Sequence, residues 1–179
     1  MKKYFLHICL SLFCSILYSQ NDISLVQKDK SKFKISLKTN SGSTDNEEIE
    51  QTIEVKNFQT GKIQIITNIE TSITGKPTHL EVNDYNFDGF TDFAAFHTDD
   101  GMGVYTIYQI FIFNQKTKNF DTLQFPTNFN PKCDMFCDVK VDKTKQTLSS
   151  SCRGGARTHK DIWKYDRNKK LILAKTESY

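Results

Sequence analysis

The sequence is poor in proline, glycine and net charge. Its 179 residues include three Pro, eight Gly and one Trp, and 24 basic side chains nearly balance 21 acidic ones. These values exclude collagen-like and low-complexity chains, and a net charge of +3 does not indicate a nucleic-acid-binding protein. A mean hydropathy of -0.52 excludes a protein with several membrane spans.

Aromatic and β-branched residues, by contrast, are abundant. The 14 Phe and 7 Tyr supply enough apolar mass for a core and are too many for a disordered chain. After residue 20, no stretch shows helical periodicity over three turns, whereas apolar and polar residues alternate at 33–37 and 53–55. Residues 104–113 form a long aromatic and β-branched run. The sequence therefore predicts an all-β fold, with one domain over residues 21–179.

A polar, lysine-rich segment occurs three times between apolar stretches. The copies begin at Asn114, Asp142 and Asp166, so their starts are 28 and 24 residues apart. Hairpins at this interval are typical of small blade-like sheets, although the lysine-rich hairpin tips of any β protein have similar sequences. We expect a compact antiparallel β-propeller-like domain of repeated hairpins.

Residues 1–20 have the features of a secretory signal peptide. Two lysines precede an apolar run over residues 4–18, and polar residues follow it. The run is short for a membrane anchor, and Phe13 is too bulky for Cys14 to be a lipoprotein cysteine. We expect cleavage near Ser19 or Gln20, no membrane span in the mature chain, and a periplasmic or secreted product.

Export leaves three cysteines in an oxidising compartment, where thiols close in space usually pair. A hairpin centred between Thr144 and Lys145 places Cys137 opposite Cys152, at a spacing that a disulfide can bridge. We therefore predict the pair Cys137–Cys152, with Cys133–Cys152 as the competing pair. A zinc site formed by the three thiols and a histidine would lack any standard ligand spacing.

Residues 84–92, DYNFDGFTD, have the pattern D-x-N-x-D-G-x-x-D of a calcium loop. Calcium takes six to eight hard oxygen ligands, and alternate side chains of such a loop converge on one point. Three carboxylates at this spacing would repel each other without a cation. The predicted ligands are Asp84, Asn86, Asp88, the carbonyl oxygen of Phe90, and Asp92, directly or through water.

The surroundings of this loop differ from those of an EF-hand. The twelfth position, which holds a bidentate glutamate in an EF-hand, is Ala95 here. Residues 80–82 and 93–96 are typical of strands, so we expect a strand, a calcium loop and a second strand. The competing interpretation is an Asx-rich turn that binds no metal.

The calcium loop, the aromatic strand and the lysine-rich turn after it together resemble a family of small exported calcium-binding proteins. That family has a propeller-like β fold related to FG-GAP and VCBS repeats, and its best-understood members are immunity proteins or periplasmic inhibitors of lysozyme-like peptidoglycan hydrolases. The segment LSSSCRGGA at 148–156, followed by WKY at 163–165, is similar to the family's S-x-x-R-x-G-A…Y stretch. The resemblance covers about residues 78–176.

In the related lysozyme inhibitors, a loop with Ser, Gly and Tyr enters the hydrolase cleft. The resemblance therefore implies a partner-binding set of Ser151, Arg153, Gly154, Gly155 and Tyr165. Glycines allow close approach, and an arginine can pair with the catalytic carboxylates of such hydrolases. Cys152 departs from the family pattern, and the competing interpretation is that the segment only ends one strand and turns into the next.

Sequence motifs of common hydrolases are absent. Neither H-E-x-x-H nor G-x-S-x-G occurs, and no Ser-His-Asp order is present for His79, His97 or His159. We therefore expect a non-catalytic calcium-binding protein that inhibits a lysozyme-like peptidoglycan hydrolase. The alternative is a structural or adhesive FG-GAP-type calcium module, and a secreted enzyme of unrecognised type ranks last.

Overall fold

The computed structural model describes residues 22–40, 50–99 and 104–179, and antiparallel strands dominate all three ranges. One short 3-10 helix, Thr127–Phe129, accompanies the strands in these ranges. The prediction of an all-β fold is confirmed. The predicted signal peptide lies outside the described residues. Among the residues described, no helix is long and apolar enough to cross a membrane.

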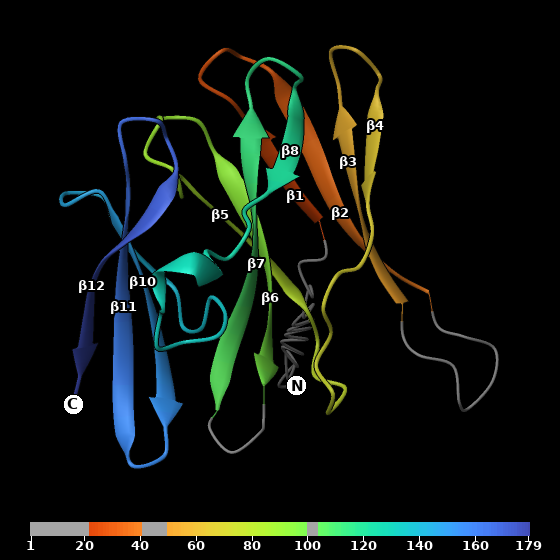
Figure 1. Cartoon of the computed structure of the whole chain (residues 1–179). Coiled ribbons are helices and arrows are strands. Elements are labelled where there is room, and N and C mark those ends of the chain that lie inside the picture. Colours follow the sequence, from red (N-terminus) through yellow and green to blue (C-terminus); the bar gives the residue numbers. More distant parts are fainter. Residues whose placement is uncertain (1–21, 41–49, 100–103) are drawn as a thin grey trace, which may run out of the picture.

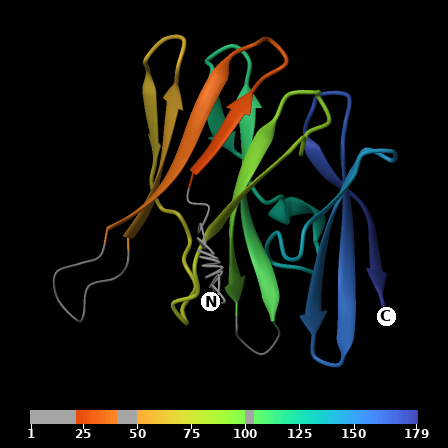
Figure 2. The ribbon, with the colours of Figure 1, turned by 180° about the vertical axis from the view of Figure 1, so that it is seen from behind.

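The strands form three four-stranded antiparallel sheets, each a meander in which every strand pairs with the next one in sequence. Sheet 1 contains β1 (Asp22–Val26), β2 (Lys32–Asn40), β3 (Glu50–Asn57) and β4 (Ile63–Ile66). Sheet 2 contains β5 (His79–Asn83), β6 (Asp92–Asp99), β7 (Tyr105–Asn114) and β8 (Asn119–Thr122). Sheet 3 contains β9 (Lys140–Asp142), β10 (Thr147–Gly154), β11 (Arg157–Tyr165) and β12 (Leu171–Ser178). The sheets follow one another in chain order, with sheet 2 in the middle (Figures 1 and 2).

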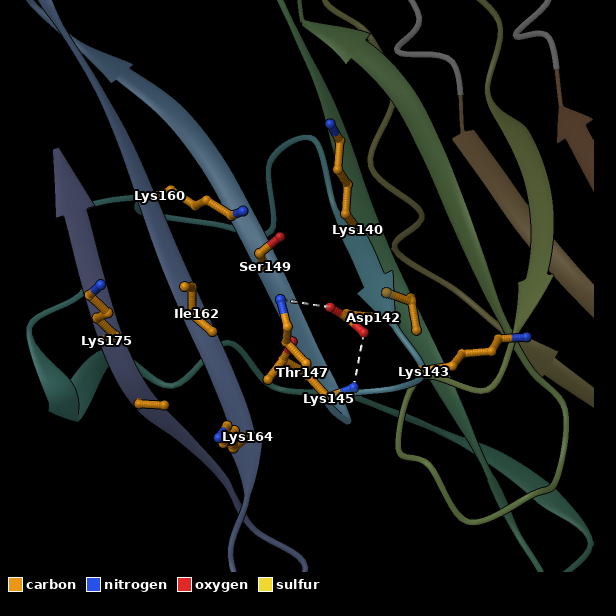
Figure 3. A pocket seen from close by; sticks show the side chains of 12 residues that line it. Lys140, Asp142, Lys143, Lys145, Thr147, Ser149, Lys160, Ile162, Lys164 and Lys175 are labelled. Carbon is orange, nitrogen blue, oxygen red and sulfur yellow. Dashed lines mark hydrogen bonds and ion pairs between the residues drawn. The ribbon is translucent and has the colours of Figure 1, made fainter. Parts of the chain in front are cut away.

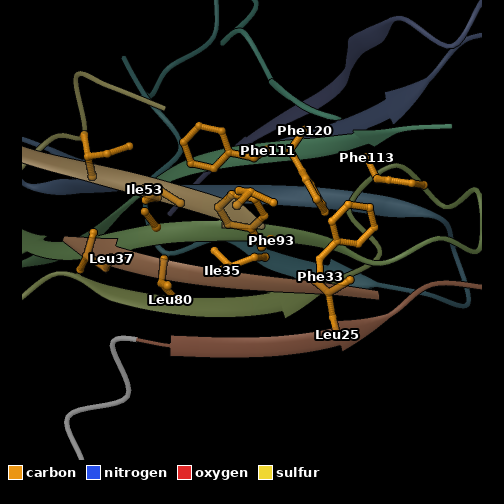
Figure 4. Close-up of a cluster of buried hydrophobic side chains, with 13 residues drawn as sticks. Leu25, Phe33, Ile35, Leu37, Ile53, Leu80, Phe93, Phe111, Phe113 and Phe120 are labelled. Carbon is orange, nitrogen blue, oxygen red and sulfur yellow. The ribbon is translucent and has the colours of Figure 1, made fainter. Parts of the chain in front are cut away.

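Sheet 2 is buried on both faces, because it packs against sheet 1 on one side and sheet 3 on the other. The first core, shown in Figure 4, joins side chains of sheets 1 and 2, and the second joins sheets 2 and 3 around Trp163. In β6, Phe93 and Ala95 belong to the first core, whereas Ala94 between them belongs to the second. Successive side chains of a strand point to opposite faces, so two-sided burial explains the continuous apolar runs of β6 and β7.

The predicted lysine-rich copies at Asn114 and Asp142 are hairpin turns, and they share a side-chain cap with the β3–β4 turn at Asn57. Asn57, Asn114 and Asp142 each end a strand and accept backbone N–H groups from residues two or three positions ahead. The residue four positions on has a positive φ in each case, between 51° and 69°. One such turn occurs in each sheet. The third predicted copy, at Asp166, is the β11–β12 turn and is also capped by its first side chain.

The predicted disulfide between Cys137 and Cys152 is wrong, because the disulfide joins Cys133 and Cys152. The register of the β9–β10 hairpin is as predicted. However, Cys137 lies outside this hairpin, because β9 begins only at Lys140. Asp138 turns the chain with a φ of 43°, and Cys137 instead bridges to Ile107 in β7. Cys137 is a buried free thiol. Burial raises the pKa of this thiol to about 11, so it is protonated and unreactive at neutral pH.

Candidate metal centre and binding hairpin

The DYNFDGFTD segment connects β5 to β6, as the expected unit of strand, loop and strand. Asp84, Asn86 and Asp88 are all partly buried in it. The N–H of Asp88 donates to Oδ1 of Asp84 at 3.1 Å and to Oδ1 of Asn86 at 3.0 Å. The N–H of Gly89 donates to the other oxygen of Asp84 at 2.9 Å, and Oδ1 of Asp88 accepts from Phe90. The loop therefore gathers two carboxylates and one amide oxygen around its own backbone.

Asp92 has a different environment from the other acidic residues of the motif. Its side chain is fully buried, and its two carboxylate oxygens accept hydrogen bonds from the backbone N–H groups of Tyr85 and Phe113, both at 2.8 Å. Burial raises the pKa of Asp92 to about 7, and the nearby carboxylates of Asp88 and Asp84 act in the same direction. Asp92 thus links the loop to β7.

The loop offers oxygen ligands of the kind that calcium prefers. Across the described ranges, no three His, Cys, Asp or Glu side chains gather in an arrangement that could hold a metal ion. The predicted ligands in the loop are the carboxylates of Asp84 and Asp88, the amide oxygen of Asn86 and the carbonyl of Phe90. Each carboxylate oxygen of Asp92 accepts a backbone N–H group, and the role of Asp92 as a ligand, directly or through water, stays a prediction. These hard oxygens fit calcium, and because the loop is partly exposed, water can complete a shell of six to eight ligands.

The β10–β11 hairpin carries four of the residues assigned to partner binding: Ser151, Arg153, Gly154 and Gly155. Its tip lies at the end of sheet 3 that faces away from the calcium loop (Figure 1). A side chain at Gly154 would meet Nε2 of His159 at 2.9 Å, and Gly155 has a φ of 64°. The backbone at Gly155 therefore favours glycine, and a larger residue at Gly154 would require the ring of His159 to move.

Two contacts hold this hairpin in place: a tether from Tyr105, which the sequence did not indicate, and the disulfide, which was the competing pair in the sequence prediction. The hydroxyl of Tyr105, at the start of β7, accepts the N–H of Arg153 at 2.8 Å and donates to the carbonyl of Arg153 at 3.2 Å. The disulfide ties Cys152 to Cys133, in the segment between β8 and β9. The side chain of Arg153 is exposed, and its Nε donates to the carbonyl of Gly155 at 3.2 Å. The tip is thus exposed but anchored to the neighbouring sheet and segment.

Tyr165 is separated from the other four assigned residues. It pairs with Leu171 at the far end of β11, and its ring lies 6.4 Å from that of Phe87 in the calcium loop. Burial raises the pKa of Tyr165, and its buried hydroxyl has no hydrogen-bond partner among the described residues. The structure therefore places Tyr165 beside the candidate metal centre.

The 84–92 loop and the hairpin tip therefore lie at opposite ends of the strands (Figure 1). The buried Asp92 and the tether from Tyr105 are visible only in the folded chain, because their partners lie 21 and 48 residues away in sequence. No protein-family model, curated protein or solved structure matches the chain.

Proposed function

We propose that this chain is an exported, non-catalytic, calcium-binding protein that inhibits a lysozyme-like peptidoglycan hydrolase through the tip of the β10–β11 hairpin. One observation supports this function above all: the tip is exposed, yet it is anchored by Tyr105 and by the disulfide of Cys152. A loop held in one conformation loses little entropy when it binds, so such a hairpin is suited to enter a cleft.

The residues of the tip fit this role. Gly154 and Gly155 have no side chains to hold a partner away, and the guanidinium of Arg153 can form paired hydrogen bonds with a carboxylate. Glycoside hydrolases of the lysozyme type use two carboxyl groups that flank the scissile bond. In this proposal, Arg153 pairs with one of these groups and blocks access of the glycan.

Calcium has a structural role in the same proposal. Asp84, Asn86, Asp88 and the carbonyl of Phe90 hold the ion, while Asp92 fixes the loop to β7. The propeller-like arrangement belongs to this proposal as well, because three successive four-stranded meanders packed face to face resemble neighbouring propeller blades.

Inhibition of cell-wall lysis by the mature protein tests the hairpin directly. We expect stoichiometric inhibition of at least one member of a panel of lysozyme-family hydrolases. Replacing Arg153 by alanine should weaken inhibition at least about tenfold, because the hydrolase carboxylate that Arg153 pairs with would then be desolvated without a partner. Arg167→Ala, at an exposed arginine in the β11–β12 turn, is the matched control and should inhibit as the native protein does. Lack of inhibition across the panel would favour the structural or adhesive module instead.

Thermal unfolding tests the calcium loop. At a free calcium concentration about 100 times Kd, binding to the native state adds about 2.7 kcal/mol, which raises Tm by roughly 5–10 °C in a domain of this size. The double variant Asp84→Ala, Asp88→Ala should lose this difference between calcium and chelator, whereas Asp134→Ala, at an exposed position outside the loop, should keep it. Identical native melting curves in calcium and chelator would contradict a calcium site.

A further inference from the structure

The outer face of sheet 3 forms an open groove with a volume of about 1030 Å³ (Figure 3). Six of its lining residues are lysines, which we call the lysine groove: Lys140, Lys143, Lys145, Lys160, Lys164 and Lys175. They come from β9, the β9–β10 turn, β11 and β12, so positive charge is present on both sides of β10. The small net charge of the whole chain does not reveal this concentration.

Two small polar side chains of β10 and the partly buried Ile162 of β11 line the groove between the lysines. Thr147 and Ser149 are 8% and 7% exposed, and Ile162 lies between the lysines of β11. The inner face of the same sheet is covered by the second core, which contains Leu148 and Trp163. Lysines suit the outer face because their carbon stems cover the sheet while their ammonium groups stay in water.

Acidic side chains neutralise only part of this charge. Asp142 is the one acidic residue that lines the groove, and it accepts the backbone N–H of Lys145 while its other oxygen lies 3.5 Å from Nζ of that lysine. Glu177 is 2.8 Å from Nζ of Lys175. The other four lysines have no carboxylate within 4.0 Å in the part of the chain that the structure describes.

We propose that the lysine groove binds an anionic polysaccharide, a sugar chain that carries repeated carboxylate, phosphate or sulfate groups. Lys160 and Lys164 are four residues apart on one strand, which spaces them about 13 Å apart along the sheet. An extended chain with regular charges can meet both of them and Lys140 across β10. Thr147 and Ser149 line the groove and carry hydroxyls that can hydrogen-bond to sugar hydroxyl groups.

Two other polyanions fit the groove less well. A membrane surface is bound best when large apolar side chains project between the basic ones, but the apolar residues that line the groove are Val141 and Ile162, both partly buried, and the small Ala174. Single-stranded nucleic acid is bound through aromatic stacking platforms together with basic groups, and none of the residues that line the groove is aromatic. A groove that offers positive charge without aromatic stacking or large apolar side chains therefore favours an anionic glycan over a nucleic acid or a membrane.

Binding of the mature protein to dextran sulfate, with uncharged dextran as its counterpart, tests this proposal. We expect calorimetry to show binding to dextran sulfate alone, with an affinity that falls steeply as salt rises. The groove variant Lys140→Gln, Lys160→Gln, Lys164→Gln should bind about tenfold more weakly or worse. The matched control carries the same charge change on exposed lysines of sheet 1, Lys32→Gln, Lys56→Gln, Lys62→Gln, and should change affinity less than about twofold.

Several results would overturn the proposal. These are a lack of binding to dextran sulfate, an equal loss of binding in both triple variants, and tighter binding to phosphatidylglycerol vesicles or to a single-stranded DNA oligomer at the same salt. Melting curves of the two variants should match that of the native protein, so that weaker binding reports the groove. Arg153→Ala should leave dextran sulfate binding unchanged, which separates this site from the hairpin tip.

Discussion

Replacing Asp92 by alanine is expected to destabilise the protein by roughly 2–5 kcal/mol, because it leaves two buried N–H donors without acceptors. Its carboxylate is fully buried and accepts the backbone N–H groups of Tyr85 and Phe113. The first of these residues lies in the 84–92 loop and the second in β7, so the variant also removes the link between the loop and β7. Urea unfolding followed by circular dichroism measures the loss.

The matched comparison is Asp84→Ala, measured with and without calcium. Among the described residues, Asp84 accepts hydrogen bonds only from its own partly buried loop, so this variant should lose stability chiefly when calcium is present. Asp92→Ala should lose stability in both conditions. If Asp92→Ala unfolds like the native protein in chelator and loses only the calcium effect, Asp92 is a metal ligand and not an anchor of the loop.

Features that depend on neighbouring residues could be predicted from the sequence. The alternation of apolar and polar residues indicates strands, and the Asx residues that cap turns indicate where hairpins reverse, as at Asn114 and Asp142. The centre of the β9–β10 hairpin could be placed for the same reason. The unit of strand, loop and strand around residues 84–92 follows from the same local rules.

Features that depend on distant packing could not be predicted in this way. In the sequence pattern, Asp92 is indistinguishable from a metal ligand, and its anchoring role depends on Phe113 in another strand. The start of β9 at Lys140 depends on the bridge between Cys137 and Ile107 of sheet 2. The lysine groove could not be predicted for a different reason. The net charge of the chain sums all its charged residues and does not show that folding gathers six lysines on one face of sheet 3.

Removal of the disulfide by Cys133→Ala and Cys152→Ala is expected to cost roughly 3 kcal/mol of stability. The bond closes a loop between residues 19 positions apart. A link of this span lowers the conformational entropy of the unfolded chain, which stabilises the native state by about 3 kcal/mol. The native geometry should survive, because the buried carboxylate of Asp161 accepts the N–H groups of Lys132 and Cys133, both at 2.8 Å. Alanine is preferred to serine because Cys133 is buried.

The same variant should weaken inhibition, since the hairpin tip then keeps only its tether to Tyr105. The control is Cys137→Ala, which removes the buried free thiol and leaves the disulfide intact. Dithiothreitol should lower the Tm of the native protein and of Cys137→Ala alike, and it should not affect the double variant. If the Tm of Cys137→Ala no longer responds to dithiothreitol, the disulfide is the Cys137–Cys152 pair that the hairpin register alone would favour.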